Sequence, residues 1–134
     1  MKPRARVILA EDHALVAERL AALIADEFEL VATVSDGVQL VEVSKRFRPD
    51  VIVTDLSMPG LDGFQAVQRL RESGVAAGVI LLTMHTERET AAEALRLGAR
   101  GFVLKHFAGE ELIDAIDQVL EGRVFVSAAI RTGR

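Results

Sequence analysis

The sequence predicts an α/β fold with a doubly wound parallel sheet, and two observations support this prediction. First, short apolar runs alternate with longer stretches in which apolar residues recur at helical spacing. The runs cover residues 7–10, 30–34, 51–54, 79–82 and 101–104. Second, polar side chains follow several runs at their C-terminal ends, where open α/β sheets bind their ligands. We therefore expect five parallel strands connected by helices.

The stretches between the runs carry helical faces and helix boundaries. Apolar faces are formed by Val16, Leu20, Leu23 and Ile24, by Leu40, Val43 and Phe47, and by Leu112, Ile116 and Val119. Three pairs have the spacing of a capping box, namely Asp36 with Gln39, Asp62 with Gln65, and Thr86 with Glu89. Pro49 predicts the end of the second helix, and Gly98 predicts a left-handed residue after the fourth.

Length and composition limit the possible classes of protein. The 134 residues, half of them hydrophobic, fit one compact domain, which we place at residues 1–121. Residues 122–134 resemble the start of a linker. The sequence has no cysteine and no apolar run of about 18 residues, so we expect a cytoplasmic protein without a membrane segment. A net charge of −4 gives no electrostatic reason for this segment to bind DNA.

Acidic side chains follow two of the predicted strands. Glu11 and Asp12 come after the first run, and Asp55 closes the third. If these two strands are neighbours, the three carboxylates converge and repel one another unless a hard cation lies among them. Mg²⁺ binds through one or two carboxylates and accepts phosphate oxygens. The sequence therefore predicts a magnesium site that can receive a phosphoryl group.

Three side chains at the strand ends suit phosphoryl chemistry. Asp55 as a nucleophile would form an acyl phosphate, Lys105 could pair with the new charge, and the Thr83 hydroxyl could bond a phosphoryl oxygen. Taken singly, an Asp after a strand is usually a turn former, a Thr a strand former and a Lys a solvated charge. Their occurrence in order at successive strand ends favours a functional site.

Four segments carry a resemblance to a known family: Ile8–His13, Pro49–Gly63, Leu81–Thr83 and Ala94–Lys105. The chain resembles a response-regulator receiver domain of bacterial two-component signalling from about Arg6 to Glu121. The segments 82–85 and 122–127 are more similar to its NarL/FixJ (LuxR-type) branch, whose members usually carry a C-terminal DNA-binding domain. The resemblance implies a flavodoxin-like (βα)5 fold with strand order 2-1-3-4-5 and an output domain outside this chain.

The resemblance also implies roles for individual residues. Asp55 would accept phosphate from a phosphohistidine on a sensor histidine kinase. Asp12 would ligate Mg²⁺ directly and Glu11 through water, with the backbone carbonyl of Ser57 as a further ligand. The residues implied to contact the phosphoryl group are Lys105 and Thr83.

A switch and its output are implied as well. Thr83 would move toward the phosphate and leave space for Phe102, so that a surface changes and a phosphorylation-dependent homodimer forms. The domain would be a signalling switch that assists its own phosphotransfer and autodephosphorylation, with no other enzymatic activity. Many receivers have a cis proline after the lysine. Here His106 follows Lys105, which leaves the isomer of this peptide open.

Two other functions are compatible with parts of the pattern. A haloacid-dehalogenase-like phosphohydrolase also uses an Asp nucleophile and Mg²⁺, although Ser57 stands where that class has a second Asp. A flavodoxin-like FMN binder shares the doubly wound order, although acids replace its phosphate loop and the chain has no Trp or Tyr to stack on flavin.

Overall fold

The computed structural model describes residues 4–84 and 87–132, with side chains as far as Ile130. Strands and helices alternate along this part of the chain. Their bounds are β1 (Arg6–Ala10), α1 (Ala14–Glu27), β2 (Glu29–Val34), α2 (Gly37–Phe47), β3 (Val51–Asp55), α3 (Gly63–Glu72), β4 (Gly78–Thr83), α4 (Arg88–Arg96), β5 (Gly101–Leu104), the 3₁₀ turn η1 (Lys105–Phe107), α5 (Ala108–Leu120), β6 (Phe125–Val126) and α6 (Ala128–Thr132).

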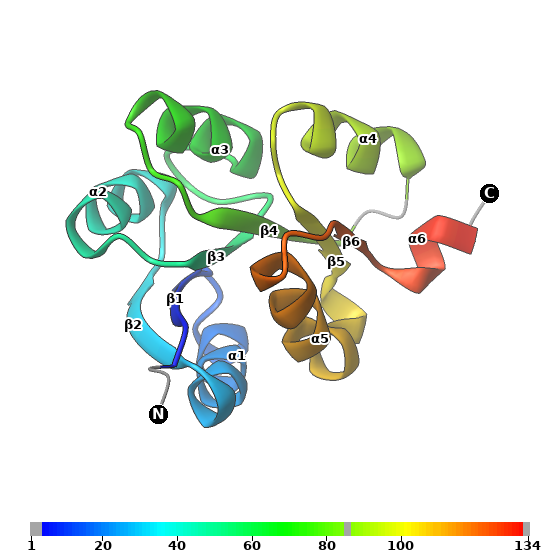
Figure 1. Cartoon of the computed structure of the whole chain (residues 1–134), viewed down its shortest axis with the longest axis horizontal. Helices are drawn as coiled ribbons and strands as arrows, with labels where there is room; N and C mark the ends of the chain where they lie inside the picture. Colours follow the sequence, from blue (N-terminus) through cyan, green and yellow to red (C-terminus); the bar gives the residue numbers. More distant parts are fainter. Residues whose placement is uncertain (1–3, 85–86, 133–134) are drawn as a thin grey trace.

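The strands form a single parallel sheet in the order β2-β1-β3-β4-β5-β6 (Figure 1). The order reverses between β1 and β3, which pair directly from Val7 with Val51 to Ala10 with Thr54. The predicted α/β doubly wound fold is therefore confirmed. The order 2-1-3-4-5 is also observed, with a sixth strand added beyond β5.

Two apolar cores lie on opposite faces of the sheet. Helices α1 and α5 cover one face, where Ile24 and Ile116 pack with strand residues such as Val53. Helices α2, α3 and α4 cover the other face, as Figure 1 shows, over a core that includes Leu70 and Phe102. Because both faces are covered, every residue of β3 is buried. This explains the uninterrupted apolar runs in the sequence.

Helices α2 and α3 begin at the predicted caps. The side chain of Asp36 accepts a hydrogen bond from the backbone N–H of Gln39, and that of Asp62 accepts one from the N–H of Gln65, each at 2.8 Å. Asp62 forms the complete capping box, since its own N–H donates to the Gln65 side chain at 3.0 Å. In α2 the Gln39 side chain accepts instead from the N–H of Ser35 at 3.3 Å.

The other predicted helix boundaries have mixed outcomes. Helix α2 ends at Phe47, two residues before Pro49, as expected. Gly98 follows the last turn of α4 with a left-handed φ of +107°. The N-cap of α4 is Glu87, whereas the predicted capping residue Thr86 lies outside the described residues.

The C-terminal residues form two elements that the sequence analysis did not predict. Within the predicted start of a linker, β6 pairs with β5 through Gly101–Phe125 and Phe102–Val126, and α6 follows. A two-residue strand has too few residues to show an alternating pattern, so sequence periodicity does not reveal it. No cis peptide bond occurs in the described residues, and the Lys105–His106 peptide is therefore trans.

Candidate functional site

The predicted site residues meet at the C-terminal edge of the sheet. Asp55 is the last residue of β3 and Thr83 the last of β4, while Glu11 directly follows β1 and Lys105 directly follows β5. The parallel register brings these ends level, since Asp55 pairs with Leu82 in β4. Glu11, Asp55 and Thr83 are buried, at 2%, 6% and 2% exposure.

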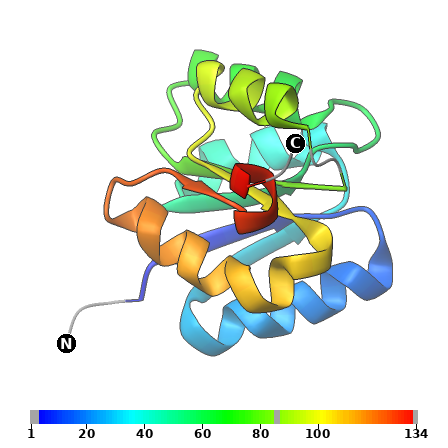
Figure 2. The same ribbon diagram turned by 90° about the vertical axis from the view of Figure 1, so that its right-hand side faces the viewer.

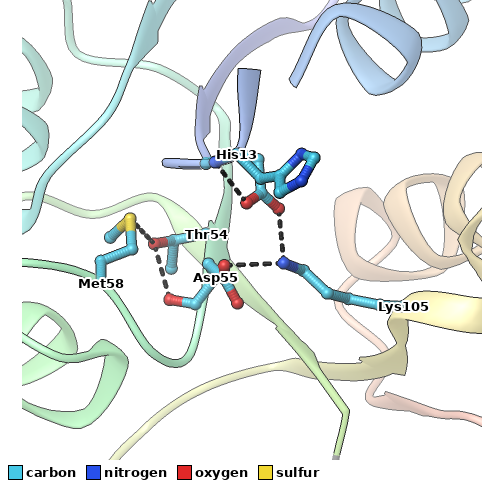
Figure 3. Close-up of polar contacts among 6 residues, drawn as sticks. His13, Thr54, Asp55, Met58 and Lys105 are labelled. Atoms are coloured by element: carbon cyan, nitrogen blue, oxygen red, sulfur yellow. Dashed lines mark hydrogen bonds and ion pairs between the residues drawn. The ribbon is translucent and has the colours of Figure 1, made fainter. Parts of the chain in front are cut away.

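Lys105 connects two of the acidic side chains. Its Nζ lies 2.7 Å from Oδ2 of Asp55 and 2.8 Å from Oε1 of Glu11. Figure 3 shows the lysine side chain extending toward Asp55 from the end of β5. The second oxygen of Glu11 accepts a hydrogen bond from the backbone N–H of His13 at 3.1 Å. The ammonium group therefore compensates the charges of two buried carboxylates.

The electrostatic environment changes the proton affinity of Asp55. Burial raises its pKa from 3.8 to about 6, the hydrogen bond from Lys105 opposes this rise, and the charge of Glu11 adds to it. For Lys105, burial alone lowers the pKa, but the hydrogen bonds and charges of Asp55 and Glu11 outweigh burial and raise it above 10.5. Asp55 is thus mostly ionised at neutral pH and is a stronger base than an ordinary carboxylate.

Three carboxylates of the site form a cluster that could bind a metal ion. One oxygen from each of Glu11, Asp12 and Asp55 lies within 4.8 Å of the others. Glu11 and Asp55 are buried, while Asp12 is exposed and opens the cluster to water. This oxygen-only set on a partly solvated rim fits a hard divalent cation that retains several waters.

The turn after β3 fixes the backbone beneath Asp55. The hydroxyl of Thr54 donates to the carbonyl oxygen of Asp55 at 3.2 Å and lies 3.9 Å from Sδ of Met58 (Figure 3). Ser57, the further predicted metal ligand, is exposed on this turn. The roles of Thr54 and of the His13 N–H were not predicted, because backbone contacts leave no side-chain signal in a sequence.

The predicted switch residues occupy adjacent strands. Thr83 pairs with Leu104 of β5, and Phe102 pairs with Leu81 of β4 and Val126 of β6. The Phe102 side chain is fully buried in the core beneath α4. In this structure the aromatic ring is therefore already in an inward position.

Comparison with known proteins shows the family to which the chain belongs. The response regulator receiver domain model matches residues 7–117, so the chain belongs to this family of two-component signalling switches. A phosphohydrolase of the haloacid-dehalogenase type, considered above, is not supported, and family membership also speaks against the FMN-binding alternative.

The relatives are response regulators of the NarL and LuxR type, as the sequence resemblance indicated. The nitrate/nitrite response regulator homologue of Haemophilus influenzae is 33% identical over 98% of this chain and 64% of its own length. The oxygen regulatory protein NreC of Staphylococcus epidermidis is 34% identical over 95% of this chain and 60% of its own length. The chain thus spans less than two thirds of these curated relatives.

Solved structures agree with this assignment. A LuxR-family two-component response regulator from Aurantimonas sp. SI85-9A1 superposes with a TM-score of 0.90 at 33% identity, covering 96% of this chain and 93% of its own. The isolated receiver domain of RcsB from Salmonella enterica serovar Typhimurium, determined with the phosphomimetic BeF₃⁻, gives a TM-score of 0.86 at 26% identity, with 96% of each chain covered. None of the described helices here is long and apolar enough to cross a bilayer.

Proposed function

We propose that Asp55 accepts a phosphoryl group from a phosphohistidine of a sensor histidine kinase. The observation that carries this proposal is the position of Asp55, buried among acids in a receiver domain with Lys105 Nζ 2.7 Å away. A cation held beside a nucleophilic carboxylate can stabilise the negative charge that arrives with the phosphoryl group.

The proposed transfer follows from the chemistry of the two groups. A carboxylate oxygen of Asp55 attacks phosphorus, and an oxygen–phosphorus bond forms as the phosphorus–nitrogen bond of phosphohistidine breaks. The imidazole leaves with the electron pair and takes up a proton. A pKa of about 6 keeps Asp55 ionised at neutral pH while burial leaves it poorly solvated. We propose that Lys105 and the Thr83 hydroxyl contact the transferred oxygens.

Mg²⁺ is the cation that we propose for the carboxylate cluster. Asp12, Asp55 and the Ser57 carbonyl would be direct ligands, and Glu11 would act through water. The 2.8 Å ion pair between Glu11 and Lys105 supports this indirect role, because one Glu11 oxygen already has a cationic partner. When bound, the ion supplies positive charge beside the carboxylates and the phosphoryl oxygens.

The proposed output is an altered surface that promotes a homodimer and, through a domain outside residues 1–134, regulates transcription. A solved RcsB complex with DNA, 26% identical over 96% of this chain, supports the role in transcription. Residues 1–134 carry a net charge of −4, which supports signalling without DNA contact by this segment. We also propose that the domain assists its own dephosphorylation. A cytoplasmic location is proposed as well, and the lack of cysteine is compatible with that reducing compartment.

Intact mass spectrometry after incubation with acetyl phosphate and Mg²⁺ tests the phosphorylation site. We expect one added phosphoryl group on the wild type and on Asp117→Asn, an exposed acid of α5, and none on Asp55→Asn. Equal labelling of Asp55→Asn would refute the assignment.

Calorimetric titration with Mg²⁺ tests the metal site separately. Asp12→Ala should weaken binding at least tenfold, because it removes a direct carboxylate ligand, whereas Glu11→Gln should weaken it less. Unchanged affinity in Asp12→Ala would contradict the proposed ligand set.

A further inference from the structure

The C-terminal strap, defined here as residues 125–132 (β6 and α6), lies against the outer side of β5. Figure 2 shows α6 between α4 and α5, and Figure 1 places it beside the same sheet edge. The strap therefore occupies the face formed by the fourth helix, the fifth strand and the fifth helix. Any change of this face on signalling has to involve the strap.

Three apolar side chains hold the strap against the two cores, Val126 and Ile130 on one face of the sheet and Phe125 on the other. Two register pairs join β6 to β5, and Phe125 and Val126 are half-buried. In α6, Ile130 is buried at 1% exposure, whereas Ala128 and Ala129 are exposed. Elements with so little buried apolar surface open locally at low free energy. The polar contacts of the strap therefore weigh heavily in its attachment.

Ser127 is the centre of these polar contacts. The residue is fully buried, and its hydroxyl accepts a hydrogen bond from the backbone N–H of Leu104 at 2.9 Å. The same hydroxyl donates to Oε1 of Glu111 in α5 at 2.5 Å, a charge-assisted hydrogen bond. The other Glu111 oxygen accepts from the N–H of Ala128 at 3.3 Å. Glu111 thus secures the start of α6, and Ser127 connects it to β5.

The β5 end of this connection adjoins the candidate site. Leu104 pairs with Thr83 in the sheet and directly precedes Lys105. Lys105 in turn lies 2.7 Å from Oδ2 of Asp55. The backbone of Leu104 and Lys105 therefore connects the Asp55 contact of Lys105 with the hydrogen bond from the Leu104 N–H to Ser127.

We propose that Ser127 and Glu111 are positioning residues that couple the state of Asp55 to the strap, so that phosphorylation loosens residues 125–132. This proposal rests on the proposed function, because it requires Asp55 to carry the phosphoryl group. Coupling is reciprocal: if phosphorylation loosens the strap, loosening the strap favours the phosphorylated state. The strap then transmits the signal to whatever chain follows it.

Hydrogen–deuterium exchange of the peptide covering residues 125–132 tests the proposal. Beryllofluoride with Mg²⁺ should accelerate exchange in the wild type about fivefold or more. Ser127→Ala and Glu111→Gln should exchange fast without beryllofluoride and show little further acceleration. Glu110→Gln, which changes the neighbouring exposed acid of α5, should behave as the wild type. Slower or unchanged exchange in the wild type with beryllofluoride would overturn the proposal.

Binding of beryllofluoride provides the reciprocal readout. Ser127→Ala should bind it more tightly by the factor by which beryllofluoride accelerates strap exchange in the wild type. Calorimetry suits this measurement, since the chain has no Trp or Tyr to report by fluorescence. Equal affinity in both proteins would refute the coupling.

Intact mass after acetyl phosphate separates this proposal from the function on which it rests. A wild type that is labelled on Asp55 but shows no change in strap exchange contradicts only the coupling. A protein that is not labelled at all contradicts the proposed function first.

Discussion

The ion pair of Asp55 and Lys105 places a charged carboxylate in a buried position, which costs folding free energy. A buried carboxylate with a raised pKa is unfavourable for folding at neutral pH, and the adjacent ammonium group compensates part of this cost. Glu11 adds a second negative charge to the same ammonium group at 2.8 Å. The surplus of negative charge at this edge is what a metal ion would neutralise.

The pKa of Asp55 predicts a pH-dependent stability of the metal-free domain. The folded-state pKa of about 6 exceeds the ordinary 3.8, so protonation favours the folded state. This contribution is fully present below pH 3.8 and is lost as the pH rises through about 6. We expect Asp55→Asn to raise the free energy of unfolding by about 1–2 kcal/mol near pH ~8 and by little near pH ~4.

Urea titration followed by circular dichroism without divalent ions measures this effect. Glu18→Gln, which removes an exposed carboxylate in the middle of α1, is the matched control. A gain for Asp55→Asn that is constant between the two pH values would disprove the raised pKa.

Removal of Lys105 should leave the fold intact but make it more dependent on metal. Lys105→Ala leaves Glu11 and Asp55 facing each other without a cation, and we expect a loss of about 1–3 kcal/mol near neutral pH. Saturating Mg²⁺ should restore more stability to Lys105→Ala than to the wild type or to Lys45→Ala, an exposed lysine of α2. Equal Mg²⁺ increments in the three proteins, measured by urea denaturation, would contradict this electrostatic balance.

At the level of elements, strands were predicted well because both sheet faces are covered. The run 51–54 differs from β3 by one residue, since a fully buried strand has no polar interruptions. The convergence of Glu11, Asp55, Thr83 and Lys105 could also be predicted from the sequence, because parallel strand ends meet at one edge of a sheet. The pairing of Glu11 with Lys105 could not, since contacts across distant segments depend on side-chain packing. The contact between Glu111 and Ser127 was missed for the same reason.

Two glycines with positive φ, Gly98 after α4 and Gly74 after α3, allow the stability cost of an added side chain to be compared. Gly98 has φ +107°, and a Cβ there would lie 2.0 Å from Nε of Arg71, whose guanidinium donates to the Gly98 carbonyl at 3.1 Å. Gly74 has φ +74° and no heavy atom within 4 Å of such a Cβ. The Arg71 guanidinium can swing away from a Cβ, so Gly98→Ala should cost about 1 kcal/mol for its positive φ and about 0.5–1 kcal/mol more for the lost Arg71 hydrogen bond, whereas Gly74→Ala should cost about 1 kcal/mol. Equal losses in thermal unfolding would show that the backbone alone decides the cost.

For the whole molecule, the proposed output predicts association that depends on the phosphorylation state. Beryllofluoride should shift residues 1–134 toward a dimer in sedimentation velocity, and Phe102→Ala should weaken this shift while Asp55 is still labelled by acetyl phosphate. The reason is that Phe102 is fully buried between the site and the strap. Identical sedimentation in both states would leave the homodimer without support. Specific DNA binding by residues 1–134 at physiological salt would contradict the expectation from charge.

Strand β6 covers the edge of β5 and so limits pairing of that edge with another copy of the domain. An open edge strand offers unpaired amides and carbonyls to any neighbouring chain. Here the N–H groups of Phe125 and Ser127 occupy the carbonyls of Arg100 and Phe102, at 3.0 and 2.9 Å. A fragment ending at residue 121 bares that row of carbonyls together with the apolar surface under Ile130. We expect such a fragment to form large species in light scattering under conditions in which residues 1–134 do not, so that the strap also protects solubility.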